Sequence, residues 1–146
     1  MPGYNNGNNN KQRNNTNYQT GFNFTAQDAK DILNINERDG KVLFEKAQAV
    51  GRQLKDDKVT VSQIRKIYSE MRKINYDDKG DYKYELRLLK AQIAYSSGRF
   101  KELKNFKNVF DNLIDETVKG GKEELKRFKD FAEAVIAYHR AENGRE

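Results

Sequence analysis

The segment TVSQIRKIYSEMRK, residues 60–73, has the pattern of a single amphipathic helix. Its opening Thr60-Val-Ser-Gln63 has the spacing of a capping box, in which the Gln63 side chain reaches back to the amide of the capping residue. Apolar residues then recur at helical intervals within an arc of roughly 120°. They are Ile64, Ile67, Tyr68, Met71 and Ile74. The pattern predicts a helix from Val61 to Ile74 with an apolar inner face.

The opposite face of this helix is basic. Arg65 and Arg72 fall on one flank, Lys66 and Lys73 fall on the other, and small serines lie between them. Long cations beside short side chains let a phosphate backbone approach closely, and each neutralised phosphate releases counterions. Glu70 is the only acid in the segment, so ion pairing within it leaves most of the charge uncancelled. Charge alone fits a phosphate-binding face and an ordinary solvated face equally well.

A second segment, LLKAQIAYSSGR at residues 88–99, predicts a helix from about Tyr84 to Ser97, ended by Gly98 in the left-handed conformation. Apolar residues mark two sides of it. One side carries Leu86, Leu89 and Ile93, and the other carries Tyr84, Leu88, Ala91 and Tyr95. A helix that is apolar on two sides is either buried between neighbours or used for association. We expect it to be the central helix.

The remaining chain predicts further helices around these two. Thr25-Ala-Gln-Asp28 resembles an N-cap and opens a short helix to about Ile35. Other helices are expected from Lys41 to Lys55, from about Phe100 to the Gly120-Gly121 break, and from Lys122 to about Ala141. The fold class predicted is all-α, a compact bundle of five to six helices.

Length and composition limit the domain organisation. A chain of 146 residues has room for one domain. Residues 1–22 are mostly Asn, Gly, Gln and Thr and bury too little to offset the entropy of ordering, so they predict a disordered tail. Residues 23–146, which contain no proline, are expected to form a single helical-bundle domain.

Neither a membrane location nor secretion is indicated by the sequence. No apolar run approaches the roughly 18 residues that a membrane helix needs. The polar N-terminus is unlike an apolar signal segment. There is no cysteine for disulfides, thiolate chemistry or a thiolate metal site. We therefore expect a cytoplasmic protein.

Signatures of catalysis are nearly absent. The one histidine, His139, lies beside an apolar stripe and is expected to be a packing residue. The acid pairs Asp56-Asp57 and Asp77-Asp78 fall in charged turns, where solvated carboxylates are ordinary. Gly120-Gly121 lacks the strand and helix around a phosphate loop. We expect no catalytic residue, no metal site and no cofactor. The net charge of +6 suits an anionic partner such as nucleic acid.

The segment before and within the helix predicted from Val61 also allows a second interpretation, a DNA-binding helix–turn–helix. Residues 54–66, LKDDKVTVSQIRK, have the turn length of a helix–turn–helix whose second helix would enter a DNA major groove. A recognition helix needs base-reading side chains in its first turn, and only Gln63 qualifies clearly. Arg65 to Lys73 suit phosphates better than base edges. A DNA-binding regulator remains the alternative function.

Three phrases together resemble the small α-helical subunit of type III-A CRISPR–Cas effector complexes, the Csm complexes. They are TVSQIRK at 60–66, LLKAQIAYSSGR at 88–99 and FAEAVIAYH at 131–139, in the same order and spacing as in that family. The resemblance covers about residues 24–143. It implies a non-catalytic RNA-binding subunit of an antiviral ribonucleoprotein.

The resemblance also implies partners and contact residues. The expected partners are the guide RNA, the target RNA, other subunits of the Csm complex and further copies of the chain. Such a subunit would contact the backbone of the guide–target duplex or the target strand without reading sequence, while RNA cleavage belongs to other subunits. The basic residues carried over are Arg65, Lys66, Arg72, Lys73, Lys90 and Arg99. The second apolar face at Tyr84, Leu88 and Tyr95 would serve packing between copies.

Overall fold

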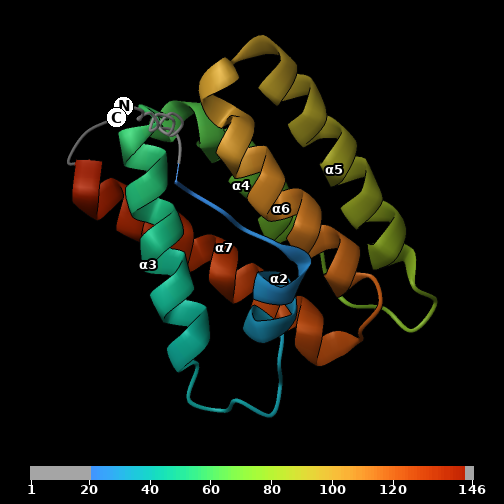
Figure 1. Cartoon of the computed structure of the whole chain (residues 1–146). Helices are drawn as coiled ribbons and strands as arrows, with labels where there is room; N and C mark the ends of the chain where they lie inside the picture. Colours follow the sequence, from blue (N-terminus) through green and yellow to red (C-terminus); the bar gives the residue numbers. More distant parts are fainter. Residues whose placement is uncertain (1–20, 144–146) are drawn as a thin grey trace, which may run out of the picture.

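The structure, a computed structural model, describes residues 21–143, and within this range the chain forms helices and no β-strand. The α-helices are α2 (Ala26–Ile32), α3 (Lys41–Asp56), α4 (Val61–Lys73), α5 (Asp81–Arg99), α6 (Lys104–Thr117) and α7 (Lys122–Asn143). A 3₁₀ turn, Lys101–Leu103, separates α5 from α6. The all-α bundle predicted from the sequence is confirmed (Figure 1).

The tail predicted for residues 1–22 lies almost wholly outside the described residues. Of that segment only Gly21 and Phe22 are described, and Phe22 packs, half-buried, against the core. The next apolar residue, Phe24, is buried, and its carbonyl accepts a hydrogen bond from the Asn108 side chain of α6 at 3.0 Å. The chain is therefore attached to the bundle just before α2 begins.

The middle of the bundle is occupied by α7, which packs along α3 and also contacts α4, α6 and α2 (Figure 1). Four fully buried phenylalanines join α7 to α6. They are Phe106, Phe110, Phe128 and Phe131. The centre of the Phe110 ring lies 4.8 Å from that of the Phe106 ring, which is tilted by 42°, and 6.1 Å from that of the Phe128 ring, which it meets edge-on. Edge-to-face contact is one of the geometries that aromatic pairs prefer. This aromatic cluster is the centre of the hydrophobic core.

A glycine allows α3 to lie close against α7. A Cβ atom at Gly51 would stand 2.9 Å from the backbone nitrogen of His139 and 2.9 Å from Cβ of Tyr138. Glycine inside a helix costs about 1 kcal/mol relative to alanine. The close packing of the two backbones explains why the chain carries glycine here.

The capping box predicted at Thr60 and the N-cap predicted at Thr25 are confirmed, and the second is also a capping box. The backbone amide of Thr25 donates to the Asp28 carboxylate at 2.7 Å, and that of Thr60 donates to Oε1 of Gln63 at 2.9 Å. In each case the threonine hydroxyl accepts the amide of the third helical residue. Each box satisfies two backbone donors that a helix start leaves open. The first helix is shorter than predicted and ends at Ile32.

The sequence prediction for α5 is wrong in two respects. The helix begins three residues earlier, at Asp81 after Gly80 in the left-handed conformation (φ 86°), and runs through Gly98 to Arg99. Gly98 is therefore no left-handed cap. The helix stops at Phe100, whose extended backbone turns its ring, half-buried, against the core. The second error concerns position, because α5 lies at the edge of the bundle against α4 and α6 (Figure 1).

Candidate nucleic-acid interface

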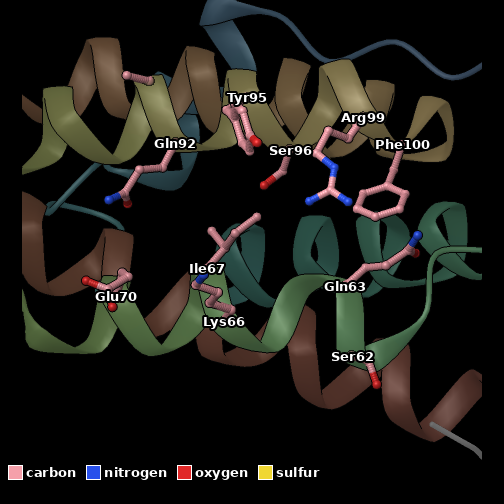
Figure 2. A pocket seen from close by; sticks show the side chains of 11 residues that line it. Ser62, Gln63, Lys66, Ile67, Glu70, Gln92, Tyr95, Ser96, Arg99 and Phe100 are labelled. Atoms are coloured by element: carbon pink, nitrogen blue, oxygen red, sulfur yellow. The ribbon is translucent and has the colours of Figure 1, made fainter.

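A groove runs between α4 and α5, the two helices that carry the quoted segments (Figure 2). Its volume is about 720 Å³. The side from α4 is lined by Ser62, Gln63, Lys66, Ile67 and Glu70. The side from α5 and its end is lined by Ala91, Gln92, Tyr95, Ser96, Arg99 and Phe100. We call this space the α4–α5 groove.

Two cations line this groove from opposite sides. Lys66 is exposed on α4 and forms no ion pair with any residue of the described part. Arg99, on the last turn of α5, projects toward α4, and its guanidinium lies over the Phe100 ring at 5.1 Å from the ring centre (Figure 2). A cation over an aromatic face is attracted by the ring quadrupole. The Phe100 ring therefore helps to position the Arg99 guanidinium in the wall of the groove.

The spacing of the two helices at this end depends on Gln63. Its Oε1 accepts the Thr60 amide, and its Nε2 donates to Oε2 of Glu102 at 2.5 Å. Glu102 belongs to the 3₁₀ turn that follows α5. The hydrogen bond from Gln63 lowers the pKa of the Glu102 carboxyl below its ordinary value. The cap of α4 is thus connected to the C-terminal end of α5.

The hydrogen bonds of Gln63 also test the helix–turn–helix interpretation. Gln63, the one clear base-reading candidate of the first turn, has both ends of its amide engaged within the protein. Val61 is buried. In addition, α3 packs along α7 rather than against α4, whereas the two helices of a helix–turn–helix form one unit. The structure therefore argues against this alternative.

The four basic residues predicted on α4 divide between two flanks. Lys73 lines a smaller hollow of about 250 Å³ that adjoins the α4–α5 groove, and its ammonium lies 3.3 Å from the Glu70 carboxylate. Exposed pairs of this kind are worth at most about 1 kcal/mol. Arg72 lies on the other flank, 5.9 Å above the Tyr68 ring, and Arg65, seven residues earlier, shares that flank. Lys66 and Lys73 therefore face α5, and the two arginines do not.

Lys90 lies on a different side of α5. Its ammonium donates to Oδ1 of Asp115 on α6 at 2.8 Å, and this hydrogen bond raises the pKa of Lys90. Lys90 does not line the α4–α5 groove. Of the six residues carried over from the family resemblance, the structure brings together Lys66 and Arg99, with Lys73 next to them.

Of the polar groove residues on α5, Arg99 was predicted from the sequence, whereas Gln92 and Ser96 were missed. Gln92, Ser96 and Arg99 recur at intervals of four and three, so they share one flank of a helix. This spacing is the sequence signal of a polar flank. The flank overlaps the apolar face predicted at Tyr84, Leu88, Ala91 and Tyr95, and this overlap obscures it.

The second apolar face of α5 is uncovered. Tyr84 is 75% exposed, Leu88 51% and Tyr95 69%. We call these three residues the α5 stripe. Exposed apolar residues that lie together on one helix mark a surface for a partner more often than singly scattered ones do.

The histidine considered for catalysis or metal binding lies outside the α4–α5 groove. His139 is buried, and one ring nitrogen, Nε2, lies 2.7 Å from the Val59 carbonyl oxygen, which requires an Nε2–H donor. Its Nδ1 has no hydrogen-bond partner within residues 21–143. Among these residues no group of His, Asp and Glu side chains is placed to hold a metal ion. None of the described helices is both long and apolar enough to span a membrane.

Comparison with protein-family models gives a match that covers most of the chain. A family model described as Csm2 Type III-A matches residues 37–145, which include α3 to α7 and every residue of the α4–α5 groove. Searches of curated proteins and of solved structures returned no match to the chain.

Proposed function

Because the chain belongs to the Csm2 Type III-A family, and is thus a small subunit of the type III-A Csm effector complex, we propose that it binds RNA there without reading sequence. The subunit is proposed to be non-catalytic, with RNA cleavage left to other subunits. Its RNA partners would be the guide–target duplex or the target strand, which it would contact mainly through phosphates.

The observation that carries this proposal is the pair of cations facing one groove. Lys66 and Arg99 come from different helices, and neither is neutralised by an ion pair with a described residue. A planar guanidinium can donate two parallel hydrogen bonds to a phosphate, and an ammonium adds a point charge. Serines and glutamines around them supply further donors to phosphate or ribose oxygens. The arrangement suits a polyanion.

The other predicted cations would extend this contact. Lys73 adjoins the groove, and Arg65 and Arg72 lie on the far flank of α4. They are proposed to reach neighbouring phosphates, because a strand of RNA is longer than one groove. Lys90 is proposed to contribute least, since Asp115 already pairs with it.

The α5 stripe supports a further part of the proposal, that copies of the subunit pack on one another within the complex. Tyr84 and Leu88, the two residues of the stripe that do not line the α4–α5 groove, expose apolar surface one helical turn apart. Burying apolar surface stabilises association by about 25 cal/mol per Å². The other Csm subunits are the alternative partners for this surface.

The proposal is tested by reversing the charge of α4 in the assembled complex. Arg65, Lys66, Arg72 and Lys73 are each changed to Glu, and the affinity for target RNA is measured over a range of salt concentrations. If four phosphate contacts are lost, the slope of log affinity against log salt falls in magnitude by about 3, since each contact contributes roughly 0.7–0.9. Circular dichroism confirms that the variant is folded.

A matched control carries four reversals away from the groove. Lys30, Lys41, Lys55 and Lys58 are all exposed and lie before α4. Changing them to Glu alters the net charge by the same amount. If both variants lose the same affinity, the loss in the α4 variant is explained by net charge and not by the α4 face. Unchanged affinity in the α4 variant would contradict RNA binding by this face and leave a scaffold role.

A further inference from the structure

Tyr95 is an unusual side chain for the wall of a groove, because it is 69% exposed and yet lines the space between α4 and α5. Figure 2 shows it projecting from α5 with Gln92 on one side and Ser96 and Arg99 on the other. An exposed aromatic ring beside cations is the basic element of single-strand nucleic-acid sites, where bases stack on the ring.

The space beside this ring is large enough for a nucleotide. The groove volume of about 720 Å³ falls within the roughly 300–1,000 Å³ of small-molecule sites. Its apolar surface comes from Ile67, Ala91 and Phe100, and hydroxyl or amide groups of Ser62, Ser96 and Gln92 surround it. An apolar surface with a few polar groups is what a flat heteroaromatic base requires.

The charges are unevenly placed along the groove. Arg99 lies one helical turn after Tyr95, so their Cβ atoms are about 5–6 Å apart. Glu70, the acid among the described lining residues, lies toward the other end with Gln92 (Figure 2). A phosphate is therefore favoured beside Arg99 and disfavoured beside Glu70. This polarity orients a nucleotide with its phosphate at the Arg99 end.

We propose that the α4–α5 groove holds one unpaired nucleotide of the RNA, its base stacked on Tyr95 and its phosphate between Arg99 and Lys66. This inference rests on the proposed RNA binding and names the part of the RNA that enters the groove. A paired base in a duplex has both faces covered by its neighbours, so only an unstacked base can lie on the ring. The site accepts any base, because every base has a π-face.

The first test is photo-crosslinking in the assembled complex with target RNA that carries 5-iodouridine at successive positions. Irradiation joins the iodinated base to an aromatic side chain that touches it. We expect crosslinks to the tryptic peptide of residues 91–99, which contains Tyr95 and no other aromatic residue. We expect this crosslinked peptide to disappear in the Tyr95→Ala variant and to persist in Tyr84→Ala, a control on the same helix whose residue does not line the groove.

The second test compares intact RNA with RNA in which the crosslinking nucleotide lacks its base. Tyr95→Ala should weaken binding of intact RNA by about 5- to 150-fold per site, as alanine substitution of stacking aromatics does. Removing the base should weaken binding to the wild type similarly and have little further effect on Tyr95→Ala, as expected for two partners of one interaction. Tyr95→Phe should bind like the wild type, because the ring rather than the hydroxyl makes the contact.

The outcomes separate this inference from the proposed function. Loss of affinity on Lys66→Glu and Arg99→Glu, with additive effects of Tyr95→Ala and base removal, would overturn the nucleotide site and keep phosphate binding. Unchanged affinity in the charge variants would overturn both. If Tyr95→Ala and Tyr84→Ala both prevent assembly of the complex, Tyr95 belongs to a protein interface and the nucleotide site is wrong.

Discussion

Gln63 on α4 and Glu102 in the turn after α5 are joined by a hydrogen bond of 2.5 Å, from Nε2 of the amide to Oε2 of the carboxylate. The same glutamine completes the capping box of Thr60 with its other amide atom, Oε1. The Gln63 side chain thus caps the start of α4 and also connects it to the turn that follows α5. This contact lies at the end of the groove where Arg99 projects toward α4 (Figure 2).

Gln63→Ala is expected to destabilise the protein by about 0.5–2 kcal/mol, because it removes half of the capping box. Urea unfolding followed by circular dichroism measures the change. Gln53→Ala is the matched control, since Gln53 also donates to a carboxylate, that of Asp57 at 2.9 Å, but closes no capping box. A larger loss from Gln53→Ala would contradict the role assigned to Gln63.

The pKa of Glu102 should report the same contact. In the folded protein the hydrogen bond from Gln63 lowers it below the ordinary value of 4.5. A lowered folded pKa means that the stabilisation is present above pH 4.5 and is lost as the pH falls through the folded pKa. Carboxyl titration by NMR should show the Glu102 pKa returning toward 4.5 in Gln63→Ala. An unchanged value would contradict the hydrogen bond as its cause.

Gly51→Ala is expected to destabilise the packing of α3 on α7. The added methyl group would stand 2.9 Å from two atoms of α7, and overpacking of this kind costs about 1–3 kcal/mol, only partly offset by the better helix propensity of alanine. Differential scanning calorimetry gives the shift in Tm. Gly98→Ala is the control, because nothing lies within 4 Å of its added Cβ, and it should raise Tm slightly.

Arg127→Lys should loosen the connection from α2 to α3. The Arg127 guanidinium donates to the Ile32 carbonyl at 2.6 Å, to the Glu37 carbonyl at 3.0 Å and to the Glu37 carboxylate at 3.1 Å. Lysine keeps the charge and loses the planar fork, so we expect a loss of about 2–3 kcal/mol in the free energy of unfolding. Hydrogen exchange should become faster in residues 33–40. Arg87→Lys, at an exposed position of α5, should have no such effect.

Lys90→Ala and Arg99→Ala should differ in RNA binding within the complex. Arg99 faces the groove and Lys90 is paired with Asp115 on α6. Loss of one phosphate contact should reduce the salt slope by about 0.7–0.9 in Arg99→Ala and hardly change it in Lys90→Ala. An equal reduction in both variants would mean that Lys90 leaves Asp115 when RNA binds, as the family resemblance implies.

Local patterns in the sequence were sufficient to predict the helices and the starts of α2, α3, α4 and α7, but not the start of α5. The N-cap at Thr25 and the capping box at Thr60 were predictable because each threonine and its partner are only three residues apart. The buried face of α4 followed from its 3.6-residue period. His139 was correctly expected to be a packing residue, since it lies beside an apolar stripe.

Such local patterns do not predict contacts between segments that lie far apart in the sequence. Gln63 and Glu102 are 39 positions apart, and no periodicity links them. The central position of α7 was not predicted, because it depends on contacts with α3, α4, α6 and α2 that lie far away in the sequence. One of these contacts is the close approach of α3 at Gly51. The basic face of α4 was visible as a charge pattern. Its division into a groove side and a far flank exists only because α5 packs against one edge of that face.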